Sequence, residues 1–103
     1  MHVISRRPFN DAAKDHPNQR QALEDLFRAL RSLNFSSPDE MRHVFPSLDN
    51  FKYKDKWWVL DVGGNNLRVI AYIQFVHKRI YVKHILTYAE YDIICNRYTR
   101  GEL

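Results

Sequence analysis

The spacing of the hydrophobic residues along the chain changes near residue 50. Before that point, apolar residues recur every three or four positions, most regularly over residues 18–34. The stripe in this segment consists of Leu23, Leu26, Phe27, Leu30 and Leu33. This spacing puts the five side chains on one face of a helix. It predicts an amphipathic helix whose apolar face belongs to the core rather than to a cofactor site.

Shorter elements are predicted on both sides of this helix. Residues 2–4 are expected to form a short strand, and Ser5 to cap a helix that ends at Pro17. Ser37–Glu40 has the capping-box pattern, with a proline at the first helical position. Pro46 ends the short helix that this pattern begins.

After residue 50 the period changes to that of strands. Segments rich in aromatic and β-branched residues predict strands at 50–53, 57–62, 67–76 and 80–86. Gly63–Asn66 supplies a tight hairpin turn, and residues 77–79 supply a second turn. Thr87 and Glu90 form another capping-box pattern, which opens a last helix. This order predicts one α+β domain over residues 1–103, with helices mainly on one face of a small antiparallel sheet.

The excess positive charge lies in the second half of the chain. Residues 51–103 hold nine Lys and Arg against five Asp and Glu, whereas residues 1–50 hold seven of each. A polyanion is the natural partner of such a surface, since each cation near a phosphate releases condensed counterions. A single cysteine, Cys95, and the lack of a long apolar stretch predict a cytoplasmic protein without a signal peptide or membrane contact.

The residue types argue against several familiar chemistries. The five histidines are scattered and there is no cysteine pair, so no zinc-ligand motif is present. The chain has no P-loop and no dinucleotide-binding glycine motif, and its acidic residues do not cluster as a two-metal nuclease requires. Cys95 lies on the apolar stripe of the last helix, where packing is the expected role. We therefore expect neither a metal nor a cofactor.

Arg68 is the first candidate for a functional site. In the strand over 67–76 the odd positions are apolar and are expected to face the core, which points Arg68 to the opposite face with Ile70 and Tyr72. Its planar donor fork could stabilise a pentacovalent phosphorane. The alternative is an ion pair with Asp61 across the hairpin.

The position of Lys83 depends on the register of the second hairpin. A three-residue turn would put Lys83 and Arg68 on opposite faces, whereas a four-residue loop or a β-bulge would put them on one face. We predict the second arrangement, because an ammonium group on the core side would be a costly buried charge. The two cations are then expected to converge on one phosphate-sized hollow beside the amino end of the last helix.

That amino end is itself a place where anions bind favourably, because its first N–H groups have no intrahelical partners. Tyr88, Glu90 and Tyr91 lie next to it. Capping explains Thr87 and Glu90 without any catalytic role, however, and Tyr91 shares the apolar stripe of the helix. Both interpretations remain open on the residues alone.

Three motifs at particular spacings connect these residues to a known family. They are DNF at 49–51, GGNxLRV at 63–69 and TxxEYD at 87–92, preceded by the N-terminal pattern MHVIS…DAA…P. Together they make the chain resemble, over essentially its whole length, the HigB toxins of the RelE-like messenger-RNA interferases.

The resemblance implies a RelE-like fold, with N-terminal helices packed on a small antiparallel sheet and a short C-terminal helix. It implies cleavage of messenger RNA in the ribosomal A site and neutralisation by a helix-turn-helix antitoxin of the HigA kind, with DNA contacted only through the antitoxin complex. By position, Arg68 matches the sheet arginine aimed at the scissile phosphate, and Lys83 the basic residue of the last strand. Many relatives have histidine where this chain has Tyr88.

We therefore predict acid–base phosphoryl transfer without a metal. A base takes the proton of a ribose 2′-OH, which attacks the adjacent phosphorus and leaves a 2′,3′-cyclic phosphate, while Arg68 and Lys83 stabilise the phosphorane. Glu90 or Tyr91 is expected to handle the proton, and a tyrosine base would need a pKa that nearby cations depress.

Further residues complete the predicted site. Tyr88 and His84 are the remaining candidates for the general acid or base. The residues expected to hold RNA or ribosomal backbone are Lys52, Lys54, Lys56, Thr87 and His84. Two other functions stay open, namely a gyrase poison of the ParE branch of this fold and a non-catalytic RNA-binding module.

Overall fold

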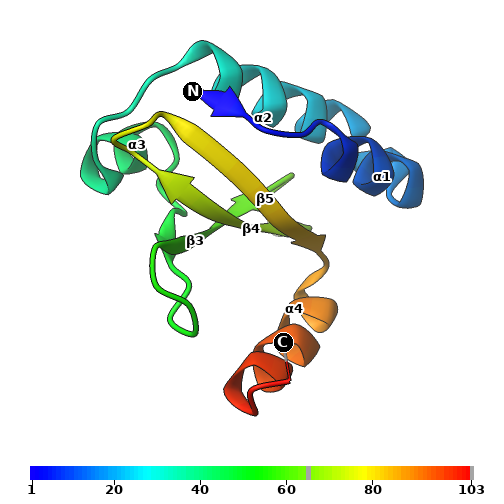
Figure 1. Ribbon diagram of the computed structural model, residues 1–103. Coiled ribbons are helices and arrows are strands. Elements are labelled where there is room, and N and C mark those ends of the chain that lie inside the picture. Colours follow the sequence, from blue (N-terminus) through cyan, green and yellow to red (C-terminus); the bar gives the residue numbers. More distant parts are fainter. Residues whose placement is uncertain (65, 103) are drawn as a thin grey trace.

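Five strands form one mixed sheet in the order β1-β5-β4-β3-β2, in a computed structural model that describes residues 1–64 and 66–102. The strands are β1 (His2–Val3), β2 (Asp49–Asn50), β3 (Trp57–Val62), β4 (Leu67–Gln74) and β5 (Arg79–Leu86). The helices are α1 (Arg7–Asp15), α2 (Arg20–Ser32), α3 (Pro38–Val44) and α4 (Tyr88–Thr99), with a 3₁₀ turn at Pro17–Gln19 (Figure 1). The predicted α+β class is confirmed.

The sheet departs from the prediction at one edge. Neighbouring strands are antiparallel except β1, which runs parallel to β5 with His2 opposite Arg79. A parallel pair needs a long crossover connection, and here the whole chain between the two strands supplies it. Asn65 of the predicted hairpin turn lies outside the described residues, as does Leu103. Gly63 and Gly64 of that turn have the positive φ values of 65° and 68° that favour glycine.

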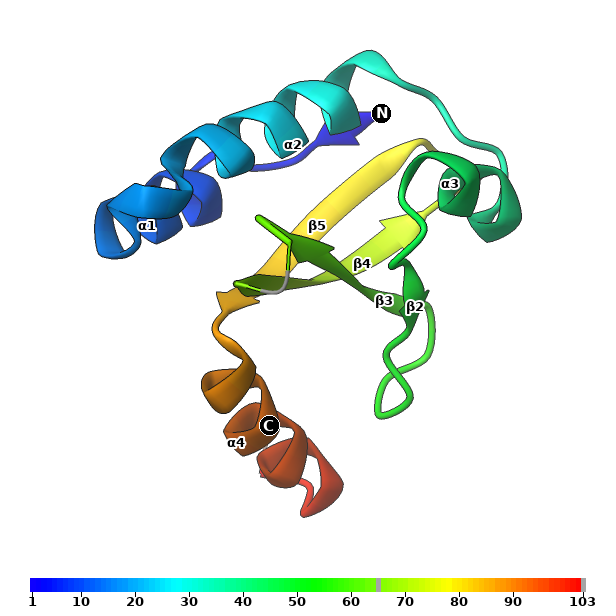
Figure 2. The same ribbon diagram turned by 180° about the vertical axis from the view of Figure 1, so that it is seen from behind.

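The two faces of the sheet carry separate apolar clusters. On one face, α1 and α2 cover the main core, into which the odd positions of β4 point, as predicted (Figure 1). On the other face, α4 packs over Phe51, Val59 and Ile70, with Tyr91 and Ile94 against them (Figure 2). The leucine stripe of α2 is buried in the main core except at its end, because the helix stops at Ser32.

Side chains cap α3 and α4 where the sequence predicts it. Ser5 is not the N-cap of α1, contrary to the prediction: the N-cap is Arg6, which forms no side-chain cap bond, and Ser5 Oγ one position earlier accepts from the Arg7 N–H at 3.2 Å. Ser37 Oγ accepts a hydrogen bond of 3.2 Å from the Glu40 N–H at the start of α3. At the start of α4 both halves of a capping box are present, since Thr87 Oγ1 accepts from the Glu90 N–H and Glu90 Oε1 accepts from the Thr87 N–H. These bonds satisfy N–H groups that have no partner inside the helix.

The strand predicted at 50–53 is shorter than expected. β2 ends at Asn50, and the chain then turns until β3 begins at Trp57. Lys56 adopts the left-handed conformation, with φ of 63°, and the Trp57 N–H donates to the Lys54 carbonyl oxygen at 3.4 Å. The aromatic residues that suggested a strand are instead used to cover the face under α4, where Phe51 is almost fully buried.

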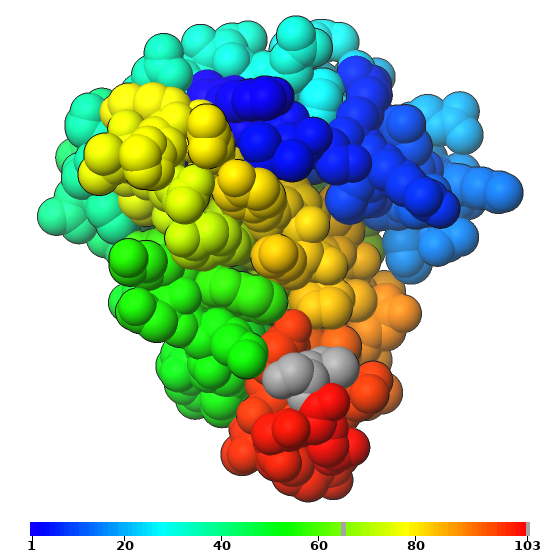
Figure 3. Space-filling view, viewed as in Figure 1, coloured from blue at the N-terminus to red at the C-terminus, as the bar shows by residue number. Residues whose placement is uncertain are grey.

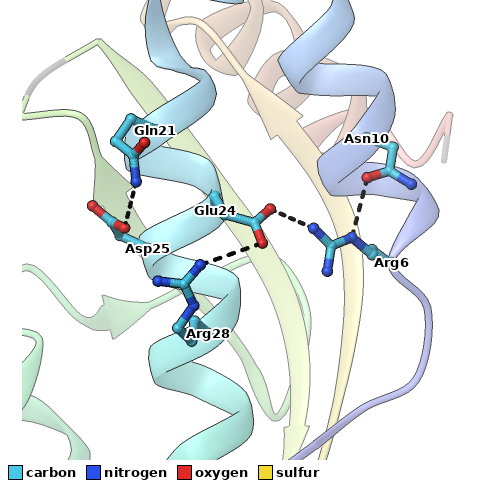
Figure 4. A network of polar contacts seen from close by, with 6 residues as sticks. All are labelled: Arg6, Asn10, Gln21, Glu24, Asp25 and Arg28. Carbon is cyan, nitrogen blue, oxygen red and sulfur yellow. Dashed lines mark hydrogen bonds and ion pairs between the residues drawn. The ribbon is translucent and has the colours of Figure 1, made fainter.

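Polar contacts link α1 to α2 on the outer surface. Arg6 pairs with Glu24, which also lies 3.8 Å from Arg28, and Arg6 Nε donates to Asn10 Oδ1 at 3.3 Å (Figure 4). Such exposed pairs contribute little stability. The apolar contacts beneath them, which include an edge-to-face pair of Phe9 and Phe27 with ring centres 5.2 Å apart, hold the two helices together.

Of the helices in the described part of the chain, none is long and apolar enough to cross a bilayer.

The second apolar cluster predicts a clear difference between two isoleucines. Ile70→Ala should lower the free energy of unfolding by about 2–5 kcal/mol, because Ile70 is fully buried between β4 and α4. Ile93→Ala, on the exposed side of α4, removes the same atoms from a residue that is 62% exposed and should change stability by about 0.5 kcal/mol at most. Urea unfolding measures both, and equal losses would contradict the described packing of α4.

Candidate active site

A β-bulge in β5 places two successive polar side chains on the face that α4 covers. Ile70 pairs with His84 and Ala71 pairs with Val82, so Lys83 is the extra residue of β5. In a bulge, two residues of one strand oppose one residue of the other, which locally suspends the alternation of side chains. Lys83 and His84 therefore share a face, while Val82 before them packs against the main core.

The hairpin between β4 and β5 has the predicted form. Gln74 pairs with Arg79, which leaves a four-residue connection, and Lys83 lies on the same face as Arg68. The ammonium of Lys83 lies 5.6 Å from the ring centre of Trp57, which is the cross-strand partner of Tyr72 on that face. The two cations are thus not back to back across the sheet.

Arg68 is held by one carboxylate and two aromatic rings. Its Nε donates to Asp61 Oδ1 at 3.1 Å across the β3–β4 hairpin, so the ion pair considered as an alternative is present. The guanidinium carbon also lies 4.6 Å from the ring centres of both Tyr88 and Tyr91. Because the ion pair uses Nε, the two terminal nitrogens can still form a fork toward a phosphate.

The guanidinium keeps its charge in this partly buried position. Burial alone would lower the pKa of Arg68, but its polar interactions with Tyr88 and Asp61 outweigh burial and raise the pKa. The Arg68 and Asp61 side chains are 28% and 22% exposed, so the pair is open to a ligand from one side. An oriented, permanently charged arginine of this kind can stabilise an anionic transition state.

Glu90 is engaged in holding the helix end. Its carboxylate accepts the Thr87 backbone N–H at 2.9 Å, and this bond is the main cause that lowers the pKa of Glu90. A carboxylate with a lowered pKa is a weaker base than an ordinary one. The Thr87 hydroxyl is likewise occupied by the cap, so both residues have a structural task already.

The depressed pKa expected for a catalytic tyrosine is wrong for Tyr91. Burial between α4 and the sheet raises the pKa of Tyr91 to about 12, and the opposing influence of the Arg68 charge is smaller. Burial penalises the phenolate more than the nearby cation stabilises it. Tyr91 is therefore a neutral phenol that packs against Arg68.

His84 is in the neutral form from which a base must start, although its lowered pKa, like that of Glu90, makes it a weaker base than the ordinary group. Burial, followed by the charge of Lys83, lowers the pKa of His84 below its ordinary value, so the imidazole is neutral near pH 7. Its Nε2 lies 3.0 Å from the hydroxyl oxygen of Tyr98 in a hydrogen bond. His84 is also the diagonal cross-strand neighbour of Arg68, a relation that brings side chains within roughly 7–8 Å of each other.

Tyr98 and Trp57 were not among the residues predicted for the site. Tyr98 bonds to His84, and its ring centre lies 5.8 Å from that of Trp57. The seven-residue spacing from Tyr91 to Tyr98, which is two helical turns, placed Tyr98 on the face that meets the sheet. The sequence did not reveal that a histidine of β5 would lie opposite.

The three predicted RNA-binding lysines lie on one turn, of which Lys54 reaches the carboxyl end of α4, away from Arg68 at the amino end of that helix. Lys52, Lys54 and Lys56 are all exposed on the turn before β3. The Lys54 ammonium lies 5.7 Å from the ring centre of Tyr98, and that of Lys52 lies 5.4 Å from Tyr53.

A hollow of about 420 Å³ lies between α1 and the amino end of α4. Lys83, His84 and Glu90 line one wall, and residues of α1, among them Arg7 and Asp11, line the other. Arg68 is not among its lining residues and rests instead against Tyr88 and Tyr91. The prediction that Arg68 and Lys83 line one hollow is therefore wrong, because the aromatic rings hold the guanidinium outside it. In residues 1–64 and 66–102, no three or more His, Cys, Asp or Glu side chains gather as metal ligands would.

Comparison with known proteins gives a consistent family. The family model described as HigB toxin, the RelE-like toxic component of a toxin–antitoxin system, matches residues 19–94, which include Arg68, Lys83 and His84. The mRNA interferase HigB of Escherichia coli O6:H1 is 58% identical over 102 residues, which are 99% of each chain. The mRNA interferase toxin HigB of Escherichia coli K12 is 41% identical over 92 residues, 89% of this chain and 88% of the relative. The chain therefore belongs to the HigB family, the RelE-like toxins of toxin–antitoxin systems.

Proposed function

We propose that this toxin inhibits translation by cleaving messenger RNA, with its reacting centre on the face of the sheet that α4 covers. The observation that carries the proposal is the bulge in β5, which puts Lys83 and His84 on one face with Arg68. A charged fork and an ammonium group can stabilise a phosphorane, and a neutral imidazole can serve as a general base, so the three together can cleave RNA without a metal. The relatives named mRNA interferases support the choice of substrate.

The proposed reaction begins with His84. Its neutral imidazole removes the proton of a ribose 2′-OH, and the 2′ oxygen attacks the adjacent phosphorus. The bond from phosphorus to the 5′ oxygen of the next nucleotide then breaks, which leaves a 2′,3′-cyclic phosphate. The departing oxygen takes a proton from Tyr88, whose ring centre lies 4.6 Å from the guanidinium carbon of Arg68. Solvent returns the proton from His84 to Tyr88.

Arg68 and Lys83 stabilise the phosphorane in this scheme. Asp61 orients the guanidinium through Nε, and the terminal nitrogens point their hydrogen bonds at the equatorial oxygens. Lys83 exchanges its contacts with aromatic rings for the phosphate. Glu90 caps α4 and Tyr91 packs under Arg68, so neither moves a proton.

The same proposal covers the partners of the toxin. The family is defined by a toxin–antitoxin system, so an antitoxin is a partner. We propose that it is a helix-turn-helix protein of the HigA kind, and that the message is cleaved in the ribosomal A site in the cytoplasm. Lys52, Lys54 and Lys56 would then bind messenger or ribosomal RNA backbone, while DNA is contacted only through the antitoxin complex. No observation favours gyrase poisoning or RNA binding without cleavage.

Arg68 gives the most direct test. Arg68→Ala should reduce the cleavage rate by roughly 100- to 1000-fold, because it removes donors that act in the transition state. Arg68→Lys keeps the charge but not the planar fork and should restore only part of the loss. Primer extension on message translated with each variant locates and quantifies the cuts. A residual rate above about a third of wild type for Arg68→Ala would exclude Arg68 from the centre.

The proposed role of His84 as the base predicts that kcat/KM depends on pH. Protonation removes its capacity as a base, so kcat/KM should fall only as the pH drops through the His84 pKa, which lies below its ordinary value of 6.5. His84→Gln should be slow and should lack this acidic limb of the pH–rate profile. A profile of His84→Gln that is merely scaled down, with the limb unchanged, would assign the base to another group.

Two substitutions of Glu90 distinguish a capping role from a catalytic role of this residue. Glu90→Gln keeps the capping bond to the Thr87 N–H, so we expect normal cleavage. Glu90→Ala should lower the free energy of unfolding by about 0.5–2 kcal/mol through loss of half the capping box. Thermal unfolding and cleavage assays on the two variants give the answer. A loss of roughly 100-fold or more in Glu90→Gln would instead identify a proton-transfer role.

A further inference from the structure

The open part of the sheet face, beyond the carboxyl end of α4, carries a row of aromatic side chains. Trp57 pairs with Tyr72 on β4, and Tyr72 pairs with Tyr81 on β5, so the three residues form one line across three strands. All three are partly exposed. We call Trp57, Tyr72 and Tyr81 the aromatic row. In Figure 3 the segments that contribute it meet at the surface beside the red end of α4.

Two contacts hold the row in place. The rings of Tyr72 and Tyr81 are stacked, with centres 5.7 Å apart and planes 28° apart. The hydroxyl of Tyr72 accepts a hydrogen bond of 3.1 Å from Gln74 Nε2. The main core does not contain these side chains, since they lie on the face away from it. Trp57 also belongs to the second apolar cluster, where its ring stacks on that of Phe51 with centres 6.0 Å apart. Neighbouring strands are about 4.8 Å apart, so the row presents a fixed aromatic surface roughly 10 Å wide.

The bulge lysine lies against this row. Lys83 Nζ is 5.6 Å from the ring centre of Trp57 and 5.9 Å from that of Tyr81. A cation over an exposed ring is held only weakly, so a nucleobase can replace Lys83 on the rings while its ammonium turns to the scissile phosphate. Arg79, opposite Gln74 at the far end of the face, adds an exposed positive charge.

We propose that the aromatic row is a stacking site for a nucleobase of the messenger RNA that flanks the cleaved nucleotide. Aromatic side chains on an open sheet face, with cations between them, are how proteins hold unpaired bases of single-stranded RNA. The row lies four residues along β4 from Arg68, a distance of roughly 13 Å. This inference rests on the proposed function, because it places the scissile phosphate at Arg68.

The test uses RNA substrates that lack one base at a time. Messages with a single abasic nucleotide at each position around the cut are cleaved by the wild-type toxin on ribosomes. We expect one flanking position at which loss of the base raises KM by roughly 5- to 150-fold, the range that base stacking spans. In Tyr72→Leu/Tyr81→Leu the intact message should show the same penalty, and removing that base should add nothing further.

Matched variants separate the alternatives. Tyr72→Phe/Tyr81→Phe keeps both rings and loses the bond to Gln74, so its KM should lie much nearer to that of the wild type than the KM of the leucine variant. Ile93→Ala, at an exposed position outside the row, should cleave as the wild type does. Unfolding curves show whether the leucine variant folds. If it does not fold, the abasic scan of the wild type alone decides. The proposal is overturned if no abasic position has an effect, if the folded leucine variant keeps the wild-type KM, or if it loses only neutralisation by the antitoxin. Arg68→Ala, measured in parallel, tests the reacting centre independently. Full cleavage activity of this variant would refute the proposed centre but would leave the effect of the missing nucleobase in place.

Discussion

The β-bulge opposite Ile70 is the constraint on which the site depends. Strict alternation along β5 would direct one of two successive polar residues, Lys83 or His84, into the main core, where an unpaired charge is very costly. The extra residue turns both toward α4, and the next position, Ile85, returns to the core. One irregularity therefore serves the fold, by keeping polar groups out of the core, and the chemistry, by placing a cation beside an imidazole.

The helix that follows the bulge completes the environment of these groups. α4 buries Ile70 and brings two tyrosines, seven residues apart, onto the sheet. Burial raises the pKa of Tyr91 and lowers that of His84, because in each case it favours the neutral form. The same packing therefore makes the phenol inert near neutral pH and leaves the imidazole able to accept a proton. For both Tyr91 and His84, the depth of the side chain under α4 is the main cause of the shift in pKa.

The cations on this face share one kind of contact. Arg68 lies over Tyr88 and Tyr91, Lys83 over Trp57 and Tyr81, and Lys54 over Tyr98. Contacts of this type are weak at exposed positions, about 0.5–1 kcal/mol. These contacts position a charge without neutralising it, so a phosphate can replace the ring as the partner of the cation at a small cost in free energy. Of these three cations, Arg68 alone has a carboxylate partner among residues 1–64 and 66–102, and that bond leaves the end of its fork available.

The sequence by itself determined the features that arise from interactions over a few residues. These are the leucine stripe of α2, the alternation along β4 and the capping box of Thr87 and Glu90, and the motifs around them were enough to indicate the family. The tertiary structure decided which face Lys83 takes, the depth of Tyr91 and the partner of His84. Strand register and burial depend on residues far apart along the chain, and a pKa follows burial, so no local pattern could supply them.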